Sequence, residues 1–374
     1  MSDISGIAIF RQPYSDEVTL VVQEEGTPVE LLSCADLNNR SGFVIAPFEV
    51  KPDQPILLIR PDRKEQLSLS ALSDLSPEIP VTNGIGMTGA SRMHYAIDFA
   101  NEHSQLELDT FKKIVLARCV DEQPQDDRKP LDFFLQACAL YPRLFIALVW
   151  TAKSGCWLTA TPEILLKGEG TAWQTVALAG TMKLEGEQLR YDAPLKDVPI
   201  TWTTKNLKEQ RLVATYIAEC LEQYASDFSE EGPSTVRAAN LVHLRSDFSF
   251  TLPDNAHIGD LLQSLHPTPA VCGLPKKSAF DFIVRHEHTP RRYYSGFMGM
   301  LDPQEQTSLY VSLRCMNIEQ GVCHLFAGGG LLKDSVEEQE WQETEAKLGT
   351  MRRILDKKRS ATQGDACYRR DART

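Results

Sequence analysis

Hydrophobic and polar residues alternate in short runs along the first hundred positions of the chain. Branched and aromatic residues concentrate at 7–10, 18–22, 42–45 and 56–59, with proline, glycine and aspartate between the runs. Such runs bounded by turn residues are typical of β-strands. The polar stretch 70–89 that follows contains prolines and glycines, and we expect it to be a connection.

Four more strand-like runs lie in the second part of the chain, at 113–120, 144–150, 309–316 and 322–326. The last run leads into three glycines at 328–330. Glycines between a strand and a helix are typical of a tight turn. They also let backbone amides approach an anion closely, and the pattern leaves both interpretations open.

The spacing of apolar residues predicts two long helices. From Lys205 onward, apolar residues recur every three or four positions as far as Leu221. The second helix has Ser335 followed three positions later by Glu338, the pattern of a capping box, and is expected to run to about Leu355. Strands and helices that mix without strict alternation favour an α+β or layered α/β body.

The organisation of the chain follows from these elements. We expect residues 1–105 to be a strand-rich part of the same body as a core at 106–356, which holds the motifs described below. The segment 357–374 is polar and aperiodic, and we expect it to be a mobile tail.

Composition and charge narrow the function classes. The chain has 374 residues, of which 42% are hydrophobic, so it can bury a sizeable core. A formal net charge of −12 argues against binding nucleic acid, because that requires a basic face. The longest apolar run, 144–150, is too short to span a bilayer, so we expect no membrane association.

The cysteines indicate the compartment. There are nine, scattered and without a CxxC pair, so their spacing predicts neither a zinc cluster nor a disulfide framework. A reduced compartment fits best, and we expect a cytoplasmic protein.

Acidic residues occupy positions where the helical pattern calls for apolar ones. Glu209 lies four residues before Val213 on the apolar face of the first helix. Glu340, Glu343 and Lys347 form one stripe on the second helix. A buried carboxylate without a partner is costly, so such groups pair with cations or bind a metal.

Two interpretations of these carboxylates remain open from spacing alone. Glu343 with Lys347, and Lys205 with Glu209, are both pairs four residues apart, and intrahelical ion pairs of this kind are common. Inward carboxylates from two separate helices also suit a hard cation such as Mg²⁺. The spacing by itself favours the ion pairs.

Nine segments between residues 108 and 356 then carry a family resemblance. The chain resembles the chorismate-utilising enzymes, which comprise isochorismate, salicylate, anthranilate and aminodeoxychorismate synthases, and it is most similar to isochorismate synthase. The resemblance implies a single α/β (α+β) domain in which two large, mostly antiparallel sheets stack between helices, the fold of anthranilate synthase component I. The segments, in the family's order, are 113–118 (KIVLAR), 161–165 (TPEIL), 178–181 (LAGT), 205–209 (KNLKE), 266–273 (HPTPAVCG), 294–296 (YSG), 312–314 (SLR), 326–330 (FAGGG) and 340–344 (EWQET).

The resemblance implies Mg²⁺ as the cofactor. By this comparison Glu209 and Glu343 hold the metal and Glu340 lies close to it. The metal binds the ring carboxylate of chorismate, and Lys347 offsets the negative charge.

Two residues are implied as catalytic. Lys113 matches the general base that activates the water attacking C2, where amine-installing relatives usually have glutamine. In a strand it and Lys112 face opposite sides, so one of them can face inward. Glu163 matches the general acid that protonates the departing C4 hydroxyl, which requires a raised pKa. Taken without the resemblance, Thr161 and Pro162 before it favour an ordinary helix start.

The remaining implied residues bind substrate. Arg314 would hold the pyruvyl carboxylate, since a guanidinium suits a planar carboxylate. His243, in a strand-like run, is interpreted as a core histidine beside the pocket. The other residues implied to contact substrate are Gly180, Thr181, Ala270, Tyr294, Gly328 and Lys347.

The resemblance predicts an isomerase, isochorismate synthase, that acts on chorismate. Ala270 is small where salicylate synthases tend to have a bulkier residue, and Ala179 replaces the lysine of aminodeoxychorismate synthases. A salicylate synthase and a non-catalytic chorismate-binding subunit remain as alternatives. We expect a monomer without a glutamine amidotransferase partner, and menaquinone, siderophore and salicylate synthesis are all open as destinations of the product.

Overall fold

The computed structural model describes residues 4–81, 89–124, 126–184, 200–238 and 241–356, so the predicted tail at 357–374 lies outside the described residues. Within these ranges the strands form two nine-stranded sheets in which neighbouring strands are antiparallel. The first sheet has the order β14 (Gly273–Leu274), β7 (Lys113–Glu122), β18 (Val322–Leu331), β17 (Cys315–Glu319), β9 (Gly155–Thr161), β8 (Phe145–Thr151), β1 (Gly6–Arg11), β2 (Glu17–Gln23) and β6 (Arg63–Ser68). The second sheet has the order β12 (Asp227–Ala238), β13 (Leu241–Thr251), β11 (Ala172–Lys183), β10 (Ile164–Glu169), β16 (Thr307–Val311), β15 (Phe297–Leu301), β4 (Gly42–Ala46), β5 (Ile56–Ile59) and β3 (Val29–Leu31).

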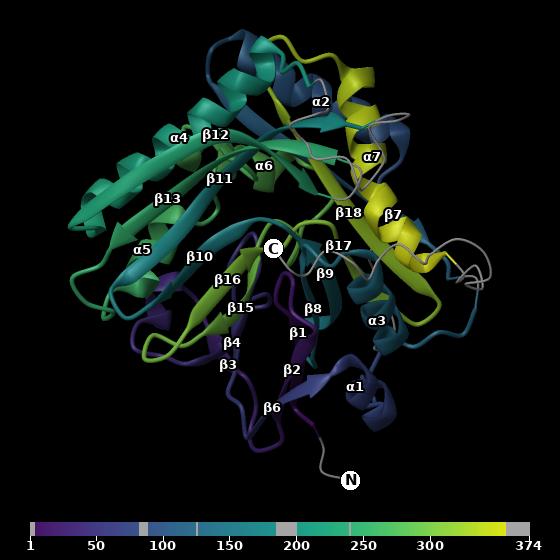
Figure 1. Cartoon of the computed structure of the whole chain (residues 1–374). Coiled ribbons are helices and arrows are strands. Elements are labelled where there is room, and N and C mark those ends of the chain that lie inside the picture. Colours follow the sequence, from purple (N-terminus) through teal and green to yellow (C-terminus); the bar gives the residue numbers. More distant parts are fainter. Residues whose placement is uncertain (1–3, 82–88, 125, 185–199, 239–240, 357–374) are drawn as a thin grey trace.

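Helices cover the outer faces of the two stacked sheets (Figure 1). One hydrophobic cluster joins the first sheet to α3 (Pro130–Leu140) and α7 (Glu337–Leu355), and another joins the second sheet to α4 (Thr204–Tyr224) and α5 (Ile258–Leu265). A third cluster, with Phe43, Trp157 and Tyr310, fills the space between the sheets. The predicted fold, two antiparallel sheets between helices, is therefore confirmed. The remaining helices are α1 (Leu69–Leu75), α2 (Arg92–Glu107), α6 (Lys276–His286) and the short 3₁₀ helix η1 (Cys34–Leu37).

The first hundred residues contribute strands to both sheets. β1 pairs with β8 in the first sheet, and β4 pairs with β15 in the second. Of the predicted connection 70–89, the first part is instead helical, because Ser68 caps α1 by accepting a hydrogen bond from the backbone N–H of Ala71 and Leu72 is buried beneath it. Residues 82–88 lie outside the described residues.

Two boundaries differ from the sequence prediction. The expected single strand 309–316 is divided into β16 and β17, and the chain crosses between the two sheets at 312–314. The capping box at Ser335 is absent, because α7 begins two residues later behind Val336 and the Ser335 hydroxyl accepts a hydrogen bond from the backbone N–H of Leu332 instead. The hydroxyl of Ser335, which the pattern predicted to cap the helix, therefore closes the turn that precedes it.

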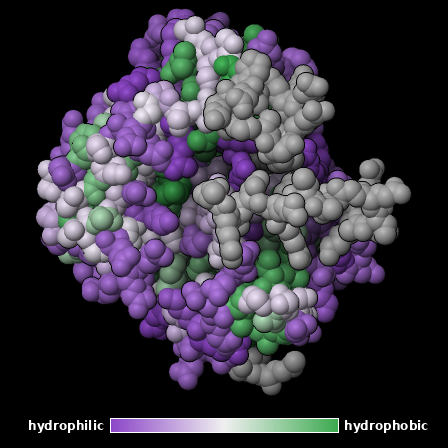
Figure 2. Space-filling view, in the orientation of Figure 1, coloured by the Kyte–Doolittle hydropathy of each residue, from purple (hydrophilic) through white to green (hydrophobic). Residues whose placement is uncertain are grey.

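No helix in the described ranges is long and apolar enough to cross a bilayer. On the face shown in Figure 2, hydrophilic residues surround the hydrophobic ones. The eight cysteines in the described part of the chain are all buried and free.

Arg11 on β1 links this strand to the chain at the end of α3. Its buried guanidinium donates to the carbonyl oxygens of Cys138, Tyr141 and Leu144, at 2.8, 2.5 and 2.9 Å, at the end of α3. Replacing Arg11 by Met removes these three buried hydrogen bonds, although the carbonyl oxygen of Tyr141 keeps the backbone N–H of Leu144 as a donor. The free energy of unfolding should therefore fall by about 2–4 kcal/mol in urea denaturation. Arg63→Met on the edge strand β6, where the arginine pairs with Glu65 in solvent, should change it by less than about 1 kcal/mol. Equal effects would contradict this account of Arg11.

Candidate active site

Three consecutive glycines at 328–330 lie inside strand β18 and not in the tight turn that is one of the two predicted alternatives. The other alternative, close approach of backbone amides to an anion, stays a prediction, and the structure shows a different use of the glycines, namely space for polar side chains. A Cβ atom on Gly328 would lie 2.8 Å from the hydroxyl oxygen of Tyr294, and one on Gly330 would lie 2.1 Å from Oε1 of Glu209. The strand therefore carries no side chains here because polar groups from other elements occupy that space.

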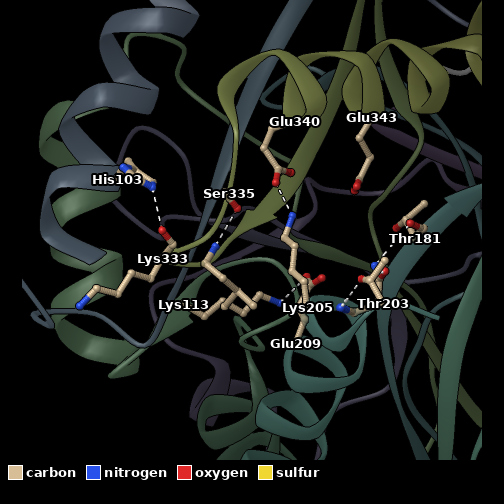
Figure 3. Close-up of polar contacts among 12 residues, drawn as sticks. His103, Lys113, Thr181, Thr203, Lys205, Glu209, Lys333, Ser335, Glu340 and Glu343 are labelled. Atoms are coloured by element: carbon tan, nitrogen blue, oxygen red, sulfur yellow. Dashed lines mark hydrogen bonds and ion pairs between the residues drawn. The ribbon is translucent and has the colours of Figure 1, made fainter. Parts of the chain in front are cut away.

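Lys113 lies at the start of β7, the strand that pairs with the glycine segment. Its side chain is fully buried while that of Lys112 is exposed, as the alternation of strand residues predicts. The Lys113 ammonium lies 3.0 Å from Oε1 of Glu209 on α4 (Figure 3). The site thus has a fully buried lysine that is paired with a carboxylate from another element.

The predicted ion pair between Lys205 and Glu209 is wrong. Glu209 turns toward Lys113, and Lys205, one helical turn earlier, reaches across to Oε1 of Glu340 on α7 (Figure 3). Both carboxylates are nearly buried, so each takes the cation that the tertiary structure brings closest. Spacing along one helix does not reveal partners that lie on another element.

The second predicted pair, Glu343 with Lys347, is confirmed at 2.8 Å. The Lys347 ammonium also donates to the carbonyl oxygen of Gly328 at 2.7 Å, so it connects α7 to β18. A Cβ atom on Gly329 would lie 3.4 Å from Oε2 of Glu340 and 3.7 Å from Oε1 of Glu343. The two carboxylates of α7 therefore approach the same point of the glycine strand.

Arg314 lies where the chain crosses between the two sheets. Its backbone is left-handed, with φ of +46°, an unusual conformation for a residue with a side chain. The guanidinium is buried and lies 2.6 Å from Nε2 of His243, whose Nδ1 lies 3.3 Å from the hydroxyl of Thr181. Burial lowers the pKa of Arg314 to about 10, so it stays charged at neutral pH. Burial and the charges of Arg314 and Lys347 lower the pKa of His243 and keep its imidazole neutral.

Glu163 lies in the short connection between β9 and β10, and the alternative of a helix start at Thr161 is wrong. Its backbone N–H donates to the Thr161 hydroxyl at 3.2 Å, and its side chain is buried. Burial raises the pKa of Glu163 to about 8, against the opposing charges of Lys113, Lys347 and Arg314. The carboxyl can therefore hold a proton at neutral pH, as a general acid must.

One cavity brings most of the predicted residues together, with about 660 Å³ of empty space including its opening to solvent. Sequence reasoning missed the apolar part of its wall, because a buried valine or leucine in a strand carries no functional signal. The predicted residues that line it are Glu163, Gly180, Thr181, Glu209, Ala270, Tyr294, Arg314, Gly328 and Lys347. The lining residues without a predicted role include Val115, Pro162, Leu178, Val271, Leu313, Phe326, Ala327 and Gly330.

The remaining predicted residues lie behind this wall. Lys113 reaches it through Glu209, and Glu340 and Glu343 lie next to the glycine strand that forms one side. Burial opposes the charge of Glu209, but Lys113 and Lys205 outweigh it and lower its pKa. Burial and the charge of Glu343 raise the pKa of Glu340, against Lys205.

The donor set of this region fits a hard divalent cation. Carboxylate oxygens from α4 and α7 face one strand, and Oε2 of the buried Glu340 has no hydrogen-bond partner among the described residues. Oxygen ligands with room for water are what Mg²⁺ prefers. In the structure the three carboxylates each face a lysine instead, so a cation would compete with Lys113, Lys205 and Lys347 for them.

Comparison with known families agrees with this geometry. The sequence model of the family described as "Chorismate binding enzyme" matches residues 57–356. The chain belongs to the chorismate binding enzyme family. The match covers each element that carries a predicted site residue, from Lys113 on β7 to Lys347 on α7.

The chain is also similar to proteins named as isochorismate synthases. The chain is 32% identical over 283 residues to the salicylate biosynthesis isochorismate synthase of Pseudomonas aeruginosa, covering 75% of this chain and 58% of that protein. It is 32% identical over 204 residues to the isochorismate synthase DhbC of Bacillus subtilis, covering 53% of this chain and 50% of that protein. The chain thus spans between half and three fifths of the length of these relatives.

A solved structure shows that the fold is shared along nearly the whole chain. The crystal structure of a putative 2,3-dihydroxybenzoate-specific isochorismate synthase from Bacillus anthracis superposes with a TM-score of 0.78 at 22% identity, covering 95% of this chain and 96% of that one. At this level of identity the likeness concerns the fold.

The glycine strand generates a stability prediction. In Gly330→Ala the new methyl group would collide with Glu209 Oε1 and with Cε of Lys113, 2.8 Å away, so we expect the free energy of unfolding to fall by about 1–3 kcal/mol. Gly349→Ala on α7 is the matched control, because a Cβ atom there meets nothing within 4 Å. It should raise stability by about 0.5–1 kcal/mol, since alanine is the better helix former. A neutral Gly330→Ala in urea denaturation would contradict the close packing of these carboxylates.

Proposed function

We propose that this protein is an isochorismate synthase, which converts chorismate to isochorismate with Mg²⁺. The observation that carries the proposal is a fully buried lysine, Lys113, that lies behind the cavity wall against Glu209, together with Glu163, a buried carboxyl group in that wall whose pKa is raised to about 8. One can take a proton from water and the other can give one to a leaving hydroxyl. The names of the relatives, isochorismate synthases of two bacteria, support the same activity.

In the proposed reaction the oxygen of a water molecule forms a bond to C2 of the ring. The Lys113 amine takes the proton of that water, the ring double bond shifts, and the bond from C4 to its hydroxyl breaks. The Glu163 carboxyl donates its proton to the departing hydroxyl, which leaves as water. The product has the same atomic composition as the substrate, so no oxidant or reductant is needed.

Glu209 and Glu343 would hold Mg²⁺, with Glu340 close enough to act directly or through water. When bound, the metal would supply positive charge for the ring carboxylate of chorismate. Glu209 can serve a cation or pair with Lys113, whose ammonium lies 3.0 Å from Oε1 of Glu209 in the structure.

The other charged residues would fix the second carboxylate of the substrate. Arg314 presents a buried guanidinium to the cavity, and His243, which lines the same cavity, lies 2.6 Å from it. His243 is neutral, so it orients the arginine without adding charge. Lys347 and the hydroxyl of Thr181 lie on the same cavity wall and offer further donors to an anion.

The experiment that tests the function is product analysis. Purified protein is incubated with chorismate and Mg²⁺, and the products are separated. Isochorismate without pyruvate supports the proposal, and salicylate with pyruvate supports the salicylate synthase alternative. Unchanged chorismate would contradict both and favour a binding subunit. Lys113→Met serves as the control for a contaminating activity, because it removes the base and should lower turnover by about 10²–10⁴-fold.

The metal proposal predicts the behaviour of Glu343→Gln. Removing one charged ligand should raise the Mg²⁺ concentration for half-maximal activity at least about tenfold. Glu338→Gln, at an exposed position of the same helix, should leave it unchanged. Isothermal titration of Mg²⁺ into the protein without substrate provides a second measurement, and equal titrations for the two variants would count against ligation by Glu343.

The pKa of Glu163 predicts the pH profile. The carboxyl is protonated below about pH 8 and loses its proton as the pH rises through that value, so kcat/KM should fall above about pH 8. Glu163→Gln should lose about 10²–10⁴-fold in turnover. Glu169→Gln, exposed on the next strand, should keep both the rate and the profile of the original protein. A Glu163→Gln variant with undiminished turnover would rule out its role as the acid.

A further inference from the structure

A second cluster of metal-ligating side chains lies on the same two strands as the candidate active site, away from it. Cys119 and Asp121 are on β7, and His324 is on β18. One ligand atom from each of them lies within 4.8 Å of the others, a thiol sulfur, a carboxylate oxygen and an imidazole nitrogen. The activity proposed above uses none of these groups.

The strand pairing explains why the three side chains meet. Cys119 and Asp121 are two residues apart, so they point to the same face of β7. Asp121 is directly opposite His324 in the register, and Cys119 is opposite Phe326. The thiol and the imidazole are buried, whereas the Asp121 side chain is 39% exposed. The cluster therefore has a rigid buried side and an opening to solvent.

The surroundings of His324 supply an independent observation. Its Nδ1 lies 2.7 Å from Oδ1 of Asp121. Its Nε2 is buried without a hydrogen-bond partner in the described ranges, and Oε2 of the buried Glu319 lies 3.5 Å away. A carboxylate behind the far nitrogen of an imidazole is the usual arrangement around a histidine that binds metal, because it fixes the ring and makes the near nitrogen a better ligand.

We propose that Cys119, Asp121 and His324 form a site for a divalent transition metal of the Zn²⁺ class, with solvent completing the coordination. Sulfur and nitrogen ligands favour Zn²⁺ and Co²⁺ over Mg²⁺, so the site differs in chemistry from the all-carboxylate region around Glu343. The second oxygen of Asp121 accepts the backbone N–H of Gly89 at 2.9 Å, which leaves Oδ1 as its ligand atom. The spacing of the cysteines along the chain carries no sign of this site, since the ligands come from strands about 200 residues apart.

A metal in this site would stabilise the fold and would take no part in the reaction. Cys119 is six residues from Lys113 along β7, about 20 Å in an extended strand. A metal there joins β7 to β18 at the end remote from Lys113 and the glycine segment. Binding requires the thiol to lose its proton, and burial raises the pKa of Cys119, which limits the affinity.

Cobalt spectroscopy on the full chain tests the proposal. Co²⁺ is added to protein in excess Mg²⁺, so that the carboxylate region is already supplied with its preferred ion. We expect a thiolate-to-cobalt charge-transfer band that saturates at a single Co²⁺ per chain and disappears on adding Zn²⁺. Zn²⁺ should also raise the Tm. Absence of the charge-transfer band would overturn the proposal and indicate an ordinary histidine–aspartate ion pair.

Variants assign the band to these residues. Cys119→Ser should abolish it, and Cys323→Ser, a buried cysteine that packs on the opposite face of β18, should keep it. Asp121→Asn changes the exposed ligand, so it should fold normally and bind Co²⁺ at least about tenfold more weakly, with a smaller Zn²⁺-induced shift in Tm. A band that survives Cys119→Ser, or an affinity unchanged in Asp121→Asn, would refute the site without bearing on the isochorismate synthase proposal.

Discussion

The site depends on the close approach of carboxylates to the three consecutive glycines of β18. Oε1 of Glu209 lies 2.1 Å from the position that a Cβ atom on Gly330 would occupy. Glu340 and Glu343 approach Gly329 from α7. Charges removed from water must be paired, so each carboxylate faces a lysine, and these ion pairs join α4, α7 and β7 around the strand. The glycines and the ion pairs therefore depend on each other, because a side chain at Gly330 would overlap with Glu209 and Lys113.

The two-sheet fold places the remaining groups on the opposite side of the cavity. Where the chain crosses from β16 to β17, the left-handed backbone of Arg314 turns its guanidinium inward, and His243 on β13 holds it there. Glu163 comes from the connection between β9 and β10, another crossing between the sheets. Residues at such crossings do not have regular strand geometry. Their polar side chains can therefore point into the cavity, where regular strands would place apolar side chains. The site thus combines groups on rigid strands and helices with groups at sheet-to-sheet connections.

Much of the fold followed from the sequence, and so did the identity of most groups in the site. Strand runs and the two long helices were predictable because their apolar periodicity reflects burial on one face. The predictions that failed were based on local sequence patterns, and each failed for a physical reason that the local pattern does not contain. The glycines at 328–330 look like a turn because glycine's usual local role is backbone freedom, whereas here it provides space. Lys205 and Glu209 have the spacing of a helical pair, but partners on other elements lie closer. The break at 312–314 was missed because no glycine or proline interrupts the run 309–316, which therefore has the pattern of one continuous strand.

The central claim is that a buried lysine activates water for attack at C2 while a buried carboxyl group protonates the leaving hydroxyl. Oxygen-isotope labelling measures this most directly. In water enriched in ¹⁸O, with chorismate and Mg²⁺, the account predicts isochorismate that carries ¹⁸O in its C2 hydroxyl, with the original C4 oxygen lost to solvent. Isochorismate that forms without ¹⁸O would mean that the hydroxyl moves within the substrate. That result would contradict the roles assigned to Lys113 and Glu163.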